Sequence, residues 1–105
     1  MADVFRALAD PTRRQLLDRL HAENGQTLSE LCEPERMSRQ AVMKHLAILE
    51  DANLVVTMRR GREKLHYLNP APIAELYERW IGKYEQSHVQ ALAQLKAALE
   101  GSGDE

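Results

Sequence analysis

The fold of this chain follows from nine consecutive residues, Ser38-Arg39-Gln40-Ala41-Val42-Met43-Lys44-His45-Leu46. Ser38 favours the start of a helix, because a serine hydroxyl can accept a hydrogen bond from a backbone N–H of the first turn. Val42, Leu46 and Leu49 then fall at i, i+4 and i+7, the spacing of one buried helix face. The stretch therefore predicts a helix with a polar outer face. Its outward positions hold Arg39, Gln40, Met43, Lys44 and Ala47.

Three shorter helices are predicted before this one. The first is the apolar-rich run 4–9. The second begins at Asp10-Pro11, which supplies an N-cap and a proline suited to the first helical position, and it ends at Asn24-Gly25. The third begins at the capping box Thr27-Leu28-Ser29-Glu30 and is short, because Pro34 cannot lie inside a helix.

After residue 53 the pattern changes from helix to strand. Asn53 lies where a helix often ends in a left-handed residue, and it is the common substitute for glycine there. Residues 54–58 and 65–68 are predicted as two strands, joined by the basic tip 59–64, in which Gly61 permits the turn. The predicted fold class is therefore mostly α with a small β-hairpin, a winged helix-turn-helix.

The C-terminal part predicts a long helix that begins after Pro70 and Pro72. Its apolar spacing of three and four residues extends beyond three heptads, which is more than one small core needs. Residues 1–100 are expected to form one domain and residues 101–105 a disordered tail. The homodimer interface is expected to use the N- and C-terminal helices through Val4, Phe5, Leu8, Tyr77, Trp80, Ile81, Tyr84, His88, Leu92 and Leu95.

The three aromatic residues of the last helix permit a second interpretation. Tyr77, Trp80 and Tyr84 are three of the five aromatic residues in the chain. They could line a box for a small molecule, but packing between subunits is favoured, because large aromatic side chains dominate such interfaces.

Charge is distributed unevenly along the chain. The formal net charge is -2, but residues 36–64 hold seven basic and three acidic groups, and this segment alone carries +4. The other 76 residues carry -6. A compact basic segment within an acidic protein is typical of a local binding site for a polyanion.

The basic segment coincides with the predicted outward helix face and the hairpin tip. The major groove of DNA is about 12 Å wide and admits one helix, whose outward side chains can then reach base edges. Arginines on the hairpin suit phosphates or a narrow minor groove. We therefore expect double-stranded DNA as partner. The predicted contacts are Ser38, Arg39, Gln40, Met43, Lys44, His45, Arg59, Arg60, Arg62 and Lys64.

Two histidines near this surface have more than one interpretation. His45 either contacts a phosphate or forms a hydrogen bond that supports the outward-facing helix, and the sequence favours neither. His66, on the second strand, is expected to have a structural or partner-facing role.

Taken together, these motifs resemble the ArsR family of bacterial winged-helix repressors. The matching stretches are residues 7–14, 28–31, 37–46, 49–55 and 59–62, and the resemblance extends over about residues 3–98 without an evident gap. It implies a homodimeric transcriptional repressor in which the first and last helices form the dimer and the 38–50 helix reads DNA. Two-fold symmetry then predicts an inverted-repeat operator.

The chain departs from the metal-sensing members of that family. Cys32 is the single cysteine, and Glu85 and His88 lack a second pair of ligands nearby, so the chain is similar to the non-metal branch and no metal or cofactor is expected. Two alternatives stay open: a sensor of metal or oxidant that uses Cys32 or an intersubunit His/Glu site, and a winged-helix adapter for protein–protein contact. No catalytic constellation is recognisable, so an enzyme is not expected.

Composition also predicts where the protein acts. No apolar stretch approaches the ~18 residues that a membrane span needs, and Asp3 and Arg6 interrupt the place of a secretory signal. The single cysteine suits a reducing compartment. A cytoplasmic location is therefore expected.

Overall fold

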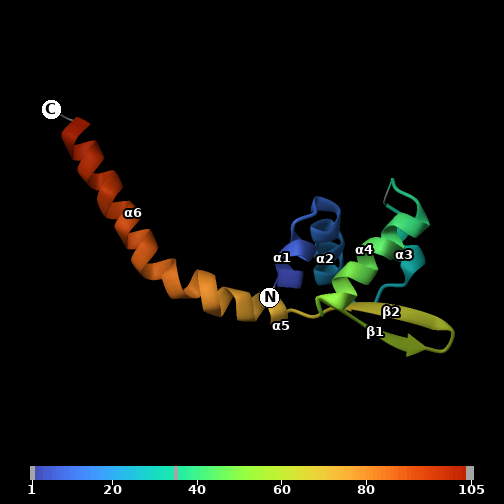
Figure 1. The fold of residues 1–105 in the computed structure, drawn as a ribbon. Coiled ribbons are helices and arrows are strands. Elements are labelled where there is room, and N and C mark those ends of the chain that lie inside the picture. Colours follow the sequence, from blue (N-terminus) through green and yellow to red (C-terminus); the bar gives the residue numbers. More distant parts are fainter. Residues whose placement is uncertain (1, 35, 104–105) are drawn as a thin grey trace. The chain divides into compact units, whose positions relative to one another are not determined.

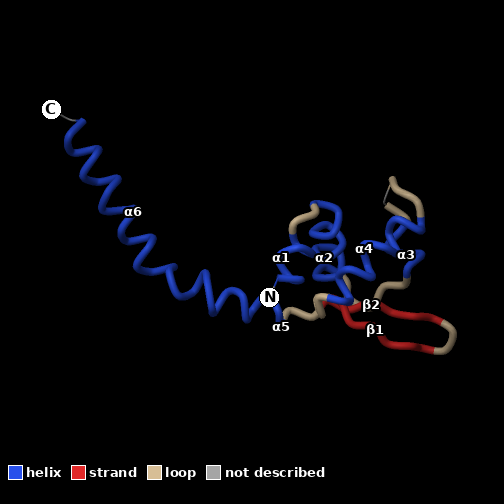
Figure 2. Tube along the Cα trace, viewed as in Figure 1, coloured by secondary structure: helices blue, strands red, loops and turns tan. Residues whose placement is uncertain are grey.

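The computed structural model describes residues 2–34 and 36–103, which form two compact units that divide after Ile73. Side-chain positions are not described for Ala2, residues 83–89 and residues 102–103. In the first unit the helices are α1 (Ala2–Leu8), α2 (Pro11–Ala22), α3 (Leu28–Cys32) and α4 (Arg39–Asp51), and the strands are β1 (Val55–Arg60) and β2 (Glu63–Leu68). The order of helices followed by a hairpin is visible in Figures 1 and 2. The observed order of elements thus agrees with the predicted winged helix-turn-helix.

The three predicted N-caps are confirmed. Asp10 Oδ2 accepts a hydrogen bond from the backbone N–H of Arg13 at 3.1 Å, and Ser38 Oγ accepts one from Ala41 at 3.2 Å. Thr27 and Glu30 form the complete capping box at the start of α3. Each cap satisfies a donor that the first turn of a helix leaves unpaired, which is why these helices begin at these residues.

The core of the first unit lies between α2, α3 and α4. Its largest fully buried side chains are five leucines and one valine, from these helices and from the residue before β1. Val42, Leu46 and Leu49, the predicted inner face of α4, are all buried, which confirms the spacing argument. The fully buried members of the core with the largest volumes are Leu16, Leu20, Leu31, Leu49, Leu54 and Val42.

The hairpin is longer and its turn tighter than the sequence predicted. The expected tip of residues 59–64 is wrong, because Arg59 pairs with Lys64 and Arg60 with Glu63, and the turn consists of Gly61 and residue 62 alone. Gly61 has a φ of 64°, which lets the backbone reverse within two residues at no steric cost. The sequence did not predict these two outer pairs because all four of their residues are charged, and strand prediction depends on β-branched and aromatic residues.

The left-handed backbone conformation predicted for Asn53 is confirmed. Asn53 follows α4 with a φ of 60°. Its carbonyl accepts a hydrogen bond from Asn69 Nδ2 at 2.8 Å, which ties the start of the hairpin to the segment after it.

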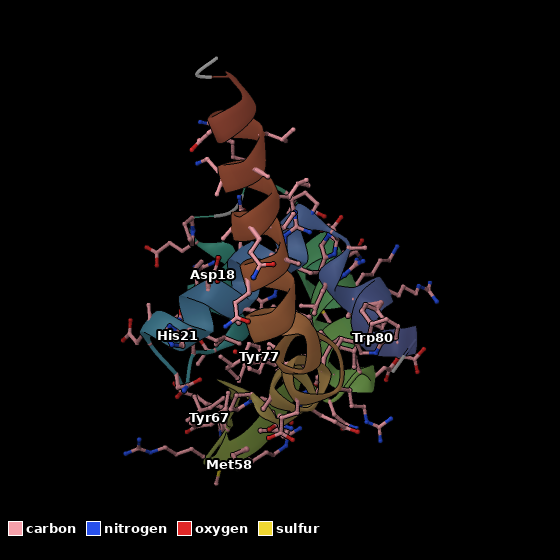
Figure 3. The ribbon with its side chains drawn as sticks, turned by 90° about the vertical axis from the view of Figure 1, so that its left-hand side faces the viewer. Asp18, His21, Met58, Tyr67, Tyr77 and Trp80 are labelled. Atoms are coloured by element: carbon pink, nitrogen blue, oxygen red, sulfur yellow. The ribbon has the colours of Figure 1, made fainter. Side chains whose placement is uncertain are left out.

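A short backbone pairing joins the hairpin to the helices. Gln26, between α2 and α3, forms an isolated antiparallel bridge with His66 of β2. The backbone N–H of Gly25 also donates to the carbonyl of His66 at 2.9 Å. A Cβ on Gly25 would lie 3.2 Å from Tyr67 Oη, so glycine lets the Tyr67 ring approach the backbone. Figure 3 labels Tyr67 and, on the paired strand, Met58.

The C-terminal helix is not a single regular α-helix. It consists of α5 (Ala71–Leu76), a π-helical segment (Tyr77–Ile81) and α6 (Gly82–Gly103). A Cβ at Gly82 would lie 3.2 Å from the carbonyl oxygen of Tyr77, so glycine fits the close approach of backbone at the wider turn. Periodicity alone does not reveal one extra residue in a turn.

The predicted tail needs a correction. Gly101–Gly103 continue α6, whereas the sequence placed them in a disordered tail. The helix formers Ala97, Ala98 and Leu99 precede them, and propagating an existing helix costs less than starting one. In the described part of the chain, none of the helices combines the length and apolar character needed to cross a membrane.

Replacing Leu49 with alanine is predicted to destabilise the first unit by about 2–5 kcal/mol, because the fully buried side chain would leave a cavity. Urea unfolding followed by circular dichroism measures the change. Gln40→Ala, at an exposed position of the same helix, is the matched control and should change the free energy of unfolding by less than about 0.5 kcal/mol. Equal losses for the two variants would contradict the assigned core.

A second prediction concerns the stability of the protein at acidic pH. The hydrogen bond from the Arg13 backbone N–H lowers the pKa of Asp10, and the positive charge of the Arg13 guanidinium lowers it further. A depressed carboxyl pKa adds stability above about pH 4, and this stability is lost as the pH falls through the lowered value. Asp10→Asn keeps a capping acceptor but no charge. The stability difference between the wild type and this variant should therefore shrink between about pH 5 and pH 3, measured by urea titrations; a constant difference would contradict the assignment.

Candidate DNA-binding surface

The outward face of α4 carries the polar residues that the sequence predicted for it. Arg39, Gln40, Met43 and Lys44 are exposed, with Met43 at 51% of its full accessible surface. An apolar side chain of this size, exposed among cations and amides, is suited to contact with a thymine methyl group. Ser38 lies at the N-cap, where its hydroxyl oxygen accepts from Ala41.

The guanidinium of Arg39 is held by the preceding helix. Its Nη1 donates to Ser29 Oγ of α3 at 3.2 Å. One neutral hydrogen bond leaves most of the five N–H donors of an arginine free. The contact therefore orients Arg39 without neutralising its charge.

The hairpin places three free arginines close together. Arg59 and Arg60 end β1, Arg62 lies in the turn, and all three are exposed. Within the described residues, no hydrogen bond or ion pair is made by their guanidinium groups. They give the outer end of the hairpin exposed positive charge, as expected of side chains that contact phosphates.

Lys64 has a partner that the sequence did not predict. Its Nζ lies 3.5 Å from Glu50 Oε1 of α4, so the ion pair joins the hairpin to the end of the outward-facing helix. Both side chains are partly exposed, and such pairs contribute at most about 1 kcal/mol. Lys64 therefore offers less free charge than the three arginines.

His45 supports α4 from the inside of the unit. Its Nδ1 lies 3.1 Å from Arg13 Nη1, and because a guanidinium can only donate, Nδ1 is the acceptor. Arg13 also donates to the carbonyl oxygens of Ala7 at 2.8 Å and Arg6 at 3.0 Å, at the end of α1. Of the two roles that the sequence left open for His45, the structure shows the hydrogen bond.

Sequence reasoning missed the structural use of the arginines on α2. Besides Arg13, Arg14 donates to the carbonyl of Leu8 at 2.7 Å, and Arg19 Nη2 donates to that of Glu30 at 2.7 Å. These bonds satisfy carbonyls at the C-terminal ends of α1 and α3, which helices leave unpaired. No local pattern could reveal them, because the donor and acceptor are six or more residues apart.

His66 has a structural position. Its side chain is buried, and Nδ1 lies 2.9 Å from the carbonyl oxygen of Gln26. Because a carbonyl only accepts, Nδ1 must carry the proton. The structural role that the sequence offered for His66 is the one observed.

The residues predicted for the dimer interface differ in how exposed they are. Phe5, Tyr77, Trp80, Ile81, Leu92 and Leu95 are exposed, and Leu8 is intermediate. Val4 is only 7% exposed and belongs to the core of its own chain, which leaves little of its surface for a partner. The side chains of Tyr84 and His88 lie outside the described residues, as does that of Glu85.

Cys32 is of intermediate exposure and forms no disulfide. In the portion of the chain that is described, no three His, Cys, Asp or Glu side chains come together in a way that could hold a metal ion.

Comparisons with known proteins identify the family. A helix-turn-helix domain model matches residues 8–57. The transcriptional regulator YuzN of Bacillus subtilis is 40% identical over 84 residues, which cover 74% of this chain and 91% of YuzN. An ArsR family transcriptional regulator of known structure is 36% identical, with a TM-score of 0.70 over 86% of this chain and 89% of that one. The chain belongs to the ArsR family of winged helix-turn-helix regulators.

Two further relatives agree with this assignment. The regulator resembles the transcriptional repressor SdpR of Bacillus subtilis, with 35% identity over 69 residues, 66% of this chain and 76% of SdpR. An ArsR-like regulator from Rhodococcus is 35% identical, with a TM-score of 0.68 over 90% of each chain. The regulator is therefore a DNA-binding transcription factor, and α4 with the preceding α3 forms its helix-turn-helix.

Replacing Arg13 with alanine is predicted to destabilise the regulator by about 2 kcal/mol, because two carbonyls and the His45 ring lose their donor. Arg13→Lys should restore little, since one ammonium group cannot span three acceptors in different directions. Gln15→Ala, an exposed position on the same helix, serves as the control in urea unfolding. If Arg13→Ala costs no more than Gln15→Ala, the buttressing role is wrong.

Proposed function

We propose that the regulator represses transcription as a homodimer on an inverted-repeat operator. The observation that carries this proposal is the joint presence of an exposed helix face with hydrogen-bonding side chains and a hairpin whose three arginines have no partner among the described residues. Its relative SdpR is named as a transcriptional repressor. The proposed action includes no catalytic step and takes place in the cytoplasm, where the DNA lies.

In this proposal α4 enters the major groove. Arg39, Gln40 and Lys44 carry the donors and acceptors that recognise guanine or adenine edges or bind phosphates, and Met43 contacts a thymine methyl. Ser38 adds a contact near the start of the helix, and His45 acts through the orientation of α4. The Arg39–Ser29 hydrogen bond limits the rotamers of Arg39 before DNA binds. Pre-orientation of this kind lowers the entropy lost on binding.

The hairpin contributes mainly electrostatic binding. Arg59, Arg60 and Arg62 reach phosphates or the minor groove and release counterions, which supplies affinity that does not depend on base sequence. Lys64 adds its charge to the same region although it is paired with Glu50. In this proposal α4 supplies the specificity for base sequence, and the hairpin supplies affinity that does not depend on sequence.

The second unit supports self-association. Trp80 is 55% exposed and Leu95 56%, and Leu92 and Leu99 lie along the same helix. Leu92, Leu95 and Leu99 follow each other at spacings of three and four, so they share one helix face. A row of exposed leucines on one face is typical of a helix that packs against another.

The division of labour is testable by mutation. Arg39→Ala should reduce affinity for the operator by about 1–3 kcal/mol and relax selection at one base position. Arg60→Ala should weaken binding to all sequences alike and lower the slope of log K against log salt by about 1. Operator sequences are first selected from random DNA, and binding is then measured by fluorescence polarisation at several salt concentrations.

Two results would contradict this proposal. Equal losses of selectivity and equal salt effects for the two variants would contradict the division between α4 and the hairpin. If the wild type binds no DNA even at low salt, an adapter role in protein–protein contact becomes the better explanation of the fold.

The homodimer has its own test. Leu95→Asp should convert the dimer to a monomer at micromolar concentration, because a charge would be buried in the proposed interface. Gln94→Asp, the neighbouring exposed position, adds the same charge and should leave the dimer intact. Sedimentation velocity distinguishes the two states. A wild type that sediments as a monomer would overturn the proposal directly.

A further inference from the structure

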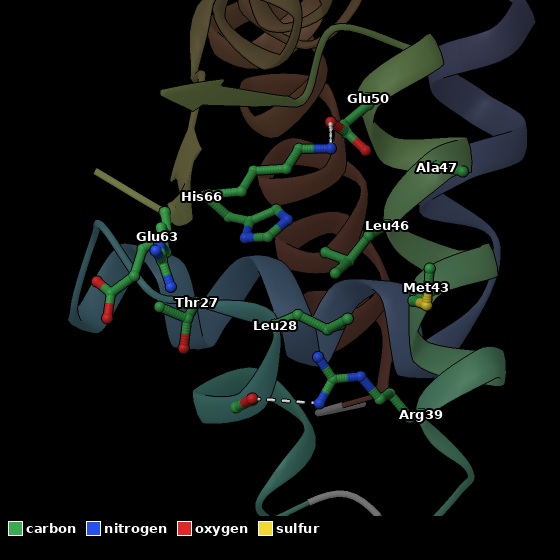
Figure 4. A pocket seen from close by; sticks show the side chains of 12 residues that line it. Thr27, Leu28, Arg39, Met43, Leu46, Ala47, Glu50, Glu63 and His66 are labelled. Atoms are coloured by element: carbon green, nitrogen blue, oxygen red, sulfur yellow. Dashed lines mark hydrogen bonds and ion pairs between the residues drawn. The ribbon is translucent and has the colours of Figure 1, made fainter. Parts of the chain in front are cut away.

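The outer part of the hairpin, α4 and α3 border a hollow that is open to solvent. Its volume is about 640 Å³. Figure 4 shows side chains from all three elements around it, with Arg39, Met43 and Leu46 on α4 and Leu28 on α3. Binding sites for small molecules commonly measure about 300–1,000 Å³. The hollow is therefore large enough for an organic ligand of two or three rings.

One wall of the hollow is apolar. Leu28, Met43, Leu46 and Ala47 contribute to it, and Met43 is half exposed to solvent there. Displacing water from such a wall with an apolar body is favourable for binding. The wall therefore suits the apolar body of an organic ligand.

The charged groups around the hollow favour an anion. Glu50 and Lys64 largely neutralise each other through their ion pair at 3.5 Å. Arg39 has one neutral partner, Ser29, and Arg62 makes no hydrogen bond or ion pair with any described residue. Glu63 adds one negative charge, so two guanidinium groups with free N–H donors face a single unpaired carboxylate. Guanidinium groups bind carboxylates and sulfonates through charge-assisted hydrogen bonds.

We propose that this hollow binds a small amphipathic organic anion, with a flat or aliphatic apolar body against Leu28, Leu46 and Ala47 and an acidic head at Arg39 and Arg62. The inference rests on the proposed function for its consequence. Arg39 and Met43 belong both to the hollow and to the DNA-reading face. A bound anion covers them and lowers affinity for the operator, which makes it an inducer.

Direct binding is tested first, without DNA. The probe is 2-naphthoate, titrated into the full-length protein by isothermal calorimetry, with the neutral 2-naphthylmethanol as the chemical control. A ligand of this size should bind with a Kd of about 0.05–1 mM, and the alcohol at least about fivefold more weakly. Equal affinity for the acid and the alcohol, or no heat from either, would overturn the inference.

Matched variants locate the site. Arg62→Gln should raise the Kd for 2-naphthoate about five- to tenfold, whereas Arg59→Gln, an arginine of the same hairpin outside the lining, should leave it unchanged. Ala47→Phe fills the hollow and should abolish binding; its fold is verified by circular dichroism. If Ala47→Phe fails to fold, the two arginine variants decide the question. Equal Kd values for these two place the probe elsewhere and overturn the site.

Competition with DNA is measured last. If the probe and DNA exclude each other, the apparent Kd for the operator rises by the factor one plus the ratio of probe concentration to probe Kd. Binding of the probe without this rise would overturn the inducer role. Operator binding without probe binding defeats the inference alone, and probe binding without any DNA binding defeats the proposed function alone.

Discussion

The pairing of Gln26 with His66 fixes the hairpin against the helices. His66 donates from its backbone N–H to the carbonyl of Gln26 at 2.8 Å and from its ring Nδ1 at 2.9 Å. The Gln26 side chain in turn donates to the carbonyls of Glu23 at 2.7 Å and Arg19 at 3.1 Å, at the end of α2. One buried glutamine thus closes a helix and anchors a strand. Both side chains are buried, and a buried polar group without a hydrogen-bond partner costs more free energy than the bond contributes, so these bonds hold the hairpin in one position.

Positive charge is not equally available on all the arginines of the first unit. The carbonyls at the ends of α1 and α3 accept hydrogen bonds from Arg13, Arg14 and Arg19. The partial negative charge at a helix C-terminus attracts such cations, so they stabilise the scaffold. The arginines of the hairpin have no such partners within the described residues. The basic segment 36–64 is therefore more distinct in the folded protein than the count of charges along the chain indicates.

Local chemistry explains which parts of the fold the sequence could predict. The N-caps at Asp10, Thr27 and Ser38 act over three residues, and the left-handed Asn53 depends on one, so all four could be derived from the sequence. The candidate surface was also predictable in outline, because outward positions follow from helical spacing. The pairing of Lys64 with Glu50 depends on how the hairpin crosses α4, and no pattern along the chain encodes that crossing.

The same reasoning explains the errors. The two-residue turn and the π-helical segment differ from the prediction by small shifts of register, to which alternation and periodicity are insensitive. Val4 was placed at an interface because an apolar residue on a short helix has two possible destinations, a core or a partner. Choosing between them requires the neighbouring helices in space.

The length of the hairpin links DNA contact to the hollow beside it. Beyond Leu65, which is still buried, the strands leave the core, and the Lys64–Glu50 ion pair connects them to α4. This extension carries Arg59, Arg60 and Arg62 away from the core, toward the phosphates of the proposed complex, and its outer residues line the same hollow as Leu28 and Met43. A shorter hairpin would cover less DNA and enclose no hollow. Reach toward DNA and the capacity to hold a ligand therefore have one structural origin, so a ligand seated there would act directly on the elements that contact DNA.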